Sequence, residues 1–219
     1  MRHVVRLDAG DGLFSPAILA SAKTLRKGGV VALPTDTLYG VTSLLEHSQR
    51  LFHVKRRSPL KPLGLFVAGP SEVHKWAKVT IAQELLRELL PGPVTLIFDR
   101  LPSLPSSFNP DTNKVGVRVP ECSFVNELCA VLAGQPLAQT SANPSGSSIH
   151  PVRISDFADL HDEIDLVVDG GEIHPPSDEG STIVDLSVAG SYRIVRSGCA
   201  LEETTAKLQR AGLVPFDDS

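Results

Sequence analysis

The feature that most constrains the fold is the alternation of short apolar segments with amphipathic helical patterns along the whole chain. Segments 30–33 and 63–68 contain no polar residue. A strand that is apolar on both sides must be covered on both faces of its sheet. Several strand segments also follow one another without an intervening helix. The pattern predicts an α/β fold with three layers, in which a twisted, mostly mixed sheet has helices on both faces.

The element boundaries follow from periodicity and from capping residues. Ser15 is expected to cap a helix whose first residue is Pro16, and Gly28-Gly29 is expected to end it. Residues 101–112 are rich in proline and serine and are expected to form a surface loop. Further helices are expected over 46–56, 81–90, 124–132 and 202–210, and strands over 30–33, 63–68, 94–98, 115–119, 137–139, 166–168, 182–186 and 192–195.

Composition excludes several classes of protein. The chain has 219 residues, of which 42% are hydrophobic and 21% charged, which is typical of a globular domain and not of a disordered chain. No apolar run approaches the ~18–20 residues of a membrane span. Three cysteines without a Cys-x-x-Cys pair indicate reduced thiols, and the seven histidines form no zinc-binding motif. We therefore expect no metal site built from protein ligands alone.

The charge balance limits how an anionic ligand can be bound. The formal net charge is −4, so an anion must be held by a local concentration of cations and not by the field of the whole protein. At the N-terminus, Arg2 and Arg6 are followed by Asp8 and Asp11, and no hydrophobic core of a secretory signal is present. We expect a cytoplasmic location, and a mitochondrial pool stays open.

A cluster of cations is the most concentrated chemical feature. Lys55, Arg56, Arg57 and Lys61 place four cations within seven residues of an acidic protein. A solvated helix end is the simpler interpretation, because cations complement the helix dipole there. Prolines on either side of Lys61 stiffen this segment, and arginine in a rigid loop suits contact with phosphate.

Four other segments place hydroxyls, amides or cations at the ends of predicted strands. Ligands of open α/β sheets usually bind at such ends, although each segment can also be a plain turn. The chain has no Walker phosphate loop, no Gly-x-Gly-x-x-Gly after a strand and no Gly-x-Ser-x-Gly elbow. From the residues alone, an α/β enzyme with an anion site is predicted. The segments are 34–40 (PTDTLYG), 141–146 (SANPSG), 180–182 (GST) and 196–198 (RSG).

Taken together and in order, these segments resemble the YrdC-type threonylcarbamoyl-AMP synthase family. The tracts at 89–96 (LLPGPVTL) and 180–185 (GSTIVD) fit the same family, and 194–201 (IVRSGCAL) most resembles its animal, single-domain members. The resemblance implies a YrdC-like catalytic domain over 15–201, with 1–14 and 202–219 as terminal extensions. It also implies the reaction of L-threonine, bicarbonate and ATP to threonylcarbamoyl-AMP and pyrophosphate.

The resemblance also implies roles for individual residues. The family's Lys-x-Arg pair falls on Lys55 and Arg57, which we expect to stabilise charge in the transition state and to bind ATP. Phe66 stands where some microbial members place a histidine against threonine, so that contact is in doubt. The other expected ATP-binding residues are Lys61, Ser141, Asn143 and Arg196, and the expected threonine-binding residues are Thr37, Arg118 and Ser181.

The chemistry of such a transfer fits this inventory. A carbamate of threonine attacks the α-phosphorus of ATP, which requires positioned anions and neutralised charge more than a covalent nucleophile. Lysine, arginine, small hydroxyls and a Mg²⁺ ion suffice. The product is expected to pass to a tRNA threonylcarbamoyl transferase complex that modifies tRNA.

Two other functions remain as alternatives. The same basic cavity could serve an RNA-binding or ribosome-maturation module, whose binding should fall steeply with salt and ignore threonine. One Trp and two Tyr offer few rings for stacking on bases, which favours the enzyme. A carbamoyl-transfer module of hydrogenase-maturation proteins is a third possibility, although it normally sits inside a longer chain.

Overall fold

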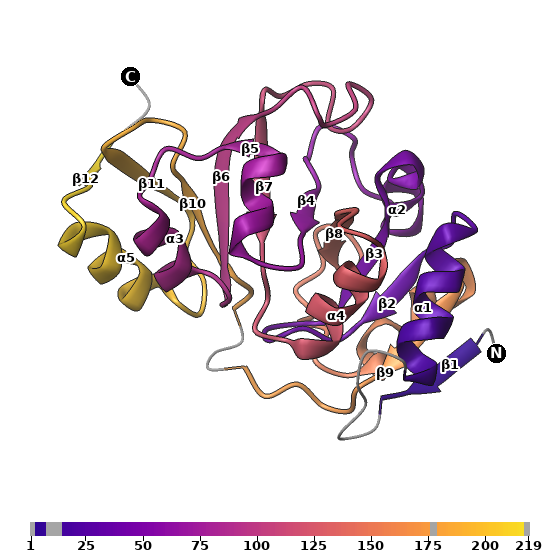
Figure 1. Cartoon of the computed structure of the whole chain (residues 1–219). Coiled ribbons are helices and arrows are strands. Elements are labelled where there is room, and N and C mark those ends of the chain that lie inside the picture. Colours follow the sequence, from indigo (N-terminus) through magenta and orange to yellow (C-terminus); the bar gives the residue numbers. More distant parts are fainter. Residues whose placement is uncertain (1–2, 8–14, 176–178, 217–219) are drawn as a thin grey trace.

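One large mixed sheet forms the centre of the molecule (Figure 1). The computed structural model describes residues 3–7, 15–175 and 179–216. The strands of this described part run in the order β1-β9-β2-β3-β8-β4-β7-β6-β10-β11-β12, and β5 pairs with β6. They are β1 (His3–Arg6), β2 (Val31–Leu33), β3 (Gly40–Leu44), β4 (Gly64–Phe66), β5 (Ala77–Lys78), β6 (Val94–Arg100), β7 (Lys114–Arg118), β8 (Leu137–Ser141), β9 (Leu166–Asp169), β10 (Thr182–Asp185), β11 (Ser191–Arg196) and β12 (Val214–Pro215).

The sheet contains both parallel and antiparallel pairs of strands. β4 runs parallel to β7 and β6 parallel to β10, whereas β8 is antiparallel to both β3 and β4. The predicted mixed sheet is therefore confirmed. The helices are α1 (Pro16–Arg26), α2 (Gln49–Val54), α3 (Gln83–Leu89), α4 (Ser123–Val131) and α5 (Leu201–Arg210), with 3-10 helices η1 (Leu45–His47), η2 (Pro70–Lys75) and η3 (Ile154–Glu163).

Two hydrophobic cores lie on opposite faces of the sheet, because successive strand residues point to opposite sides. In β2, Ala32 belongs to the core packed by α2, α3, α5 and η3, while Val31 and Leu33 belong to the core packed by α1 and α4. Helices thus cover both faces, as predicted. The first helix also begins as expected, since the Ser15 side chain accepts a hydrogen bond from the backbone N–H of Ile18 and Pro16 is the first helical residue.

The helices cover the two faces unequally. The core under α1 and α4 draws buried side chains from β2, β3, β4, β8 and β9, and none from the described residues of β6, β7, β10 and β11. The opposite core draws on those four strands as well, through residues such as Leu96, Val117 and Val184. Within the described residues, one half of one sheet face therefore has no helix packed over it.

Some predicted elements differ from the structure. The helix expected over 46–56 is broken into η1 and α2 and ends at Val54, so Lys55 already lies outside it. β3 was not predicted, because its central residues Thr42 and Ser43 are polar. Both are fully buried, and their hydroxyls donate to the carbonyls of Val31 and Leu44. The loop expected over 101–112 is confirmed.

Among the helices of the described residues, none is both long enough and apolar enough to cross a membrane. The acidic pair Asp8 and Asp11, weighed above against a targeting segment, lies outside the described residues, as does Arg2.

Candidate functional site

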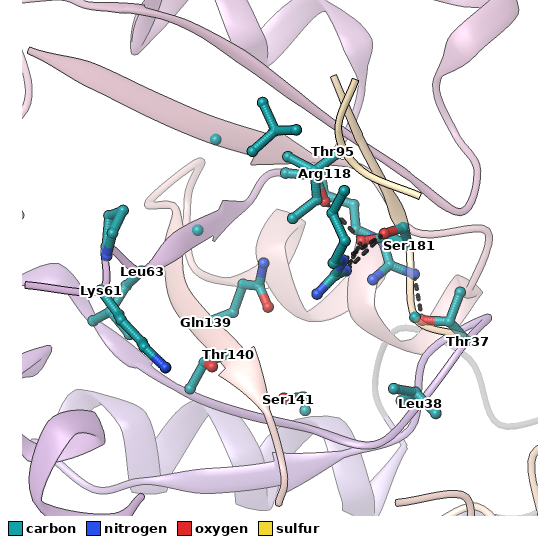
Figure 2. A pocket seen from close by; sticks show the side chains of 18 of the residues that line it. Thr37, Leu38, Lys61, Leu63, Thr95, Arg118, Gln139, Thr140, Ser141 and Ser181 are labelled. Atoms are coloured by element: carbon teal, nitrogen blue, oxygen red, sulfur yellow. Dashed lines mark hydrogen bonds between the residues drawn. The ribbon is translucent and has the colours of Figure 1, made fainter. Parts of the chain in front are cut away.

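A cavity of about 730 Å³ lies over the uncovered half of the sheet face. Its floor is formed by β8, β4, β7, β6, β10 and β11, which are consecutive neighbours in the sheet. Alternate residues of each strand face it, for example Lys114, Gly116 and Arg118 in β7. Figure 2 shows side chains from these strands and from two loops converging on this space.

The cavity collects residues that lie far apart in the sequence. Of the nine predicted site residues, every one but Lys55 lines it. Geometry therefore brings the predicted phosphate-binding and threonine-binding groups into one place. The lining residues among them are Thr37, Arg57, Lys61, Arg118, Ser141, Asn143, Ser181 and Arg196.

Lys55 lies beneath the cavity and not on its wall. It is 2% exposed, and its Nζ donates to the backbone oxygen of Ser141 at 2.6 Å and to the Ser141 hydroxyl at 3.0 Å. Asn143 Oδ1 and Thr140 Oγ1 lie 3.2 and 3.4 Å from the same nitrogen. Burial, together with the charges of Arg57 and Lys61, lowers the pKa of Lys55 to about 7. Lys55 thus holds the strand end that carries Ser141.

The segment after β8 is tied together by its own polar side chains. The Ser141 hydroxyl donates to Asn143 Oδ1 at 2.6 Å, and Asn143 Nδ2 donates to the carbonyl of Ile149 at 3.1 Å. The backbone N–H of Ser145 also donates to the carbonyl of Lys55 at 3.1 Å. These bonds fix the positions of the hydroxyl and the amide at the cavity wall.

Arg57 and Arg196 add positive charge from two different elements. Arg57 Nε and Nη2 donate to the carbonyls of Lys61 and Pro62, and no carboxylate of the described residues lies within ion-pair distance of it. Burial and the charge of Arg196 lower the pKa of Arg57, while burial and the charge of Arg118 lower that of Arg196. Cations that repel one another in this way form a receptor for an anion.

The side of the cavity with the predicted threonine-binding residues Thr37 and Ser181 is organised around Arg118. Its guanidinium forms an ion pair with Asp36, donates to Thr37 Oγ1 at 2.9 Å and lies 5.9 Å from the ring centroid of Phe66. Arg118 is 5% exposed, and its Nε has no hydrogen-bond partner among the residues that the structure describes. Burial lowers the pKa of Arg118, although the Asp36 carboxylate opposes this effect. Arg118 therefore shares its charge with Asp36, a partner that sequence reasoning did not assign.

Ser181 links the two sides of the cavity. Its hydroxyl lies 3.0 Å from Thr95 Oγ1, and its backbone oxygen accepts hydrogen bonds from Arg196 Nε and Nη2 at 3.2 and 2.6 Å. Phe66, for which the resemblance implies a histidine in some microbial members, is 1% exposed and packs into the core under α4.

Sequence reasoning missed several cavity residues. Asp185 is 1% exposed and accepts from Lys114 Nζ at 2.7 Å and Arg193 Nη2 at 3.3 Å, and all three side chains line the cavity. Thr95 and Gln139 also line it. Part of the signal was present in the alternation of apolar with polar or small residues along β7 and over 191–194 of β11, which indicates strands with one uncovered face.

No group of three or more His, Cys, Asp or Glu residues within the described ranges could hold a metal ion. Asp185, one of the carboxylates on the cavity wall, is engaged by two cations. The Asp185 carboxylate is therefore not free to bind a metal ion.

Comparison with known proteins places the chain in a family. A family model named Sua5_yciO_yrdC, described as "Telomere recombination", matches residues 23–198. The threonylcarbamoyl-AMP synthase of Bos taurus is 43% identical over 215 residues, covering 95% of this chain and 77% of that protein. The Homo sapiens protein of the same name is 43% identical over 210 residues, covering 92% and 75%.

A solved structure agrees with the sequence comparisons. The crystal structure of P. abyssi Sua5 complexed with L-threonine superposes with a TM-score of 0.82 at 26% identity. The match covers 99% of this chain and 62% of the longer archaeal chain, so this chain spans about three-fifths of it.

Proposed function

The chain belongs to the Sua5/YciO/YrdC family, and we propose from this premise that it makes threonylcarbamoyl-AMP and pyrophosphate from L-threonine, bicarbonate and ATP. The product is the activated intermediate for threonylcarbamoyladenosine in tRNA. We assign the catalytic unit to residues 15–201, with 1–14 and 202–219 as terminal extensions. Within those extensions, β1 pairs with β9, and Leu208 of α5 enters the main core.

One observation supports this proposal most: a cluster of cations and a polar pocket share one cavity. Arg57, Lys61 and Arg196 supply positive charge for a triphosphate. Thr37, Arg118 and Ser181 supply donors for an amino acid with a carboxylate and a hydroxyl. A protein that binds only RNA has no need for the second group.

The chemistry proceeds in two balanced steps. The neutral amine of threonine attacks the carbon of bicarbonate, which gives the carbamate and water. A carbamate oxygen then attacks the α-phosphorus of ATP, forming the mixed anhydride with AMP and releasing pyrophosphate. Both steps join anions, so the main tasks of the protein are positioning and charge neutralisation.

The residues divide these tasks by position. Arg57, Lys61 and Arg196 bind the phosphates, and Arg57 stabilises the charge that develops on pyrophosphate. Ser141 and Asn143 offer a hydroxyl and an amide to phosphate oxygens. Lys55 acts from below, because its ammonium is bonded to Ser141 and Asn143. Its contribution to ATP binding is therefore to position these two side chains and to add charge behind them.

Thr37, Arg118 and Ser181 bind threonine. The guanidinium of Arg118 and the hydroxyl of Ser181, which both line the cavity, are the donors for its carboxylate. A Mg²⁺ ion bound with ATP would be held chiefly by the phosphates and would supply further neutralisation of their charge. On the protein, the cations and hydroxyls of the cavity wall also neutralise phosphate charge and bind phosphate oxygens.

The test is an assay of pyrophosphate release by the purified protein. We expect release from ATP only when L-threonine and bicarbonate are both present, and a product that a tRNA threonylcarbamoyl transferase complex consumes. An RNA-binding module, the alternative, should bind RNA with a steep salt dependence that threonine does not alter. Salt-sensitive RNA binding without pyrophosphate release would reject the enzyme.

A further inference from the structure

Gln139 is a polar side chain of the cavity wall that has no role in the proposed mechanism. It is half-buried in β8, and its amide makes no hydrogen bond to any residue that the structure describes. Figure 2 shows this side chain between Lys61 on one side and Arg118 and Ser181 on the other. A donor and an acceptor are thus held in the middle of the cavity without a protein partner.

The sheet register explains this central position. Gln139 pairs with Gly64 of β4, which pairs with Gly116 of β7. Ser141 lies two residues further along β8 on the same face, on the phosphate side. Arg118 lies two residues further along β7 in the opposite direction, on the threonine side. Gln139 and its register partners Gly64 and Gly116 therefore lie between the phosphate-binding and the threonine-binding residues. Two residues along a strand separate them from each group, which is about 7 Å.

Two neighbouring glycines keep this middle row open. A Cβ atom on Gly64 would lie 2.4 Å from Gln139 Nε2, so the amide occupies space that is open only because residue 64 is glycine. A Cβ on Gly116 would lie 3.1 Å from Thr95 Cγ2. The floor here has no side chains of its own, and the Gln139 amide is the polar group at its edge.

We propose that the Gln139 amide binds bicarbonate and then the carbamate formed from it, an inference that rests on the proposed function. Bicarbonate offers two acceptor oxygens and one O–H donor, and the carbamate offers two oxygens and one N–H donor. A carboxamide matches both, since Nε2 donates to an oxygen and Oε1 accepts from the O–H or N–H. A phosphate has only acceptors facing such a site, and cations suit it better. In the proposed reaction, the group that lies between the amino acid and the α-phosphate is the one derived from bicarbonate, so Gln139 is placed to hold it.

Steady-state kinetics of Gln139→Leu test this inference in buffers depleted of bicarbonate. We expect the KM for bicarbonate to rise about tenfold, the effect of losing a hydrogen bond to a charged group, while the KM values for ATP and threonine change less than about twofold. The fold should be unaffected, because the amide has no hydrogen bond to the described residues. Gln49→Leu, the same change at an exposed glutamine on α2, is the matched control and should behave as wild type.

Two more variants separate binding from a structural effect. Gln139→Glu keeps the shape and places a carboxylate against an anion, so the KM for bicarbonate should rise more than in Gln139→Leu. Gly64→Ala leaves Gln139 in place but displaces its amide, and it should raise the same KM. An unchanged KM for bicarbonate in Gln139→Leu, or a rise in the KM for ATP or threonine instead, overturns the assignment. If wild-type protein releases no pyrophosphate with bicarbonate, the proposed function fails first and this inference with it.

Discussion

Two halves of one sheet face carry different kinds of residue. Under α1 and α4, alternate residues of β2 and β9 are apolar and fully or almost fully buried, for example Leu33 and Val168. On the uncovered half, the alternate residues of β7 and β10 include the charged Lys114, Arg118 and Asp185. The strands of both halves have the same two-residue period and belong to the same sheet. The presence or absence of covering helices therefore explains why their side chains differ.

The comparison shows how the molecule separates stability from chemistry. Strands of the uncovered half are anchored by their other face, where Val117 and Val184 pack into the main core. Their cavity face can then carry charges that a covered face could not hold without partners. Variants on the covered half should therefore change stability, and variants on the uncovered half should change turnover.

The largest effect should come from the covered half. Leu128 in α4 is fully buried in the core between α4, α1 and the sheet. Leu128→Ala should lower the free energy of unfolding by about 3.5 kcal/mol through lost burial and a cavity. Chemical denaturation measures this loss. Turnover per folded molecule should stay near wild type, and a large loss of turnover would break the separation between the two halves.

Arg57→Ala should lower turnover and leave stability almost unchanged, which is the opposite of Leu128→Ala. Removing this cation from the uncovered half should cost about 3 kcal/mol of transition-state stabilisation, which is more than a hundredfold in kcat/KM for ATP. Stability should hardly change, because Arg57 bonds only to carbonyls of its own loop. Arg56→Ala is the matched control, since the Arg56 side chain is 78% exposed and does not line the cavity. Near-normal turnover in Arg57→Ala would contradict the role assigned to it.

Much of the fold could be predicted because it depends on local patterns. The cap at Ser15, the period of α4 and the apolar segment of β2 are visible within a few residues. β3 could not be predicted in the same way. Thr42 and Ser43 are satisfied by carbonyls, one of them on the neighbouring strand β2, and that information is not local.

The candidate site was predictable as a set of residues but not as an arrangement. The family resemblance selected Lys55 and Arg118, yet only the packing shows that Lys55 is buried beneath Ser141 and that Arg118 is paired with Asp36. Gln139 carries no motif. Its importance depends on the register with Gly64, which a single sequence does not specify.

The substitution Asp185→Asn tests whether charges on the uncovered half also contribute to stability. Burial raises the pKa of Asp185, but hydrogen bonds from Lys114 and Ser187 outweigh it and lower the pKa below its usual value. Asp185→Asn should therefore cost about 2 kcal/mol of stability at pH 7, because it removes a buried carboxylate that accepts hydrogen bonds from cations.

The lowered pKa of Asp185 fixes the direction in which its contribution to stability changes with pH. A carboxylate with a lowered pKa stabilises the fold above its unfolded pKa of about 4, and this stabilisation is lost as the pH falls through the lower, folded-state pKa. Unfolding by urea at several pH values should show that wild type loses its advantage over Asp185→Asn in acid. A constant difference down to the lowest pH at which both fold would show that the charge of Asp185 is not the cause.

The smallest predicted effect concerns Lys55, which lies at the boundary between the buried core and the cavity. Its pKa of about 7 means that the ammonium is half neutral at that pH in the free protein. ATP brings negative charge and favours the charged form, so binding should take up a proton above pH 7. The affinity for a non-hydrolysable ATP analogue should then fall about fivefold from pH 7 to pH 8, which is ~1 kcal/mol.

Two substitutions decide whether Lys55 is the titrating group. Lys55→Arg keeps a charge throughout this range, because guanidinium titrates far above it. Lys55→Met has no charge at any pH. The fall in affinity between pH 7 and pH 8 should disappear in both, and calorimetry in buffers of different ionisation enthalpy should show no proton uptake. If either folded variant keeps the wild-type slope, the proton belongs to another group, and Lys55 serves only to position Ser141 and Asn143.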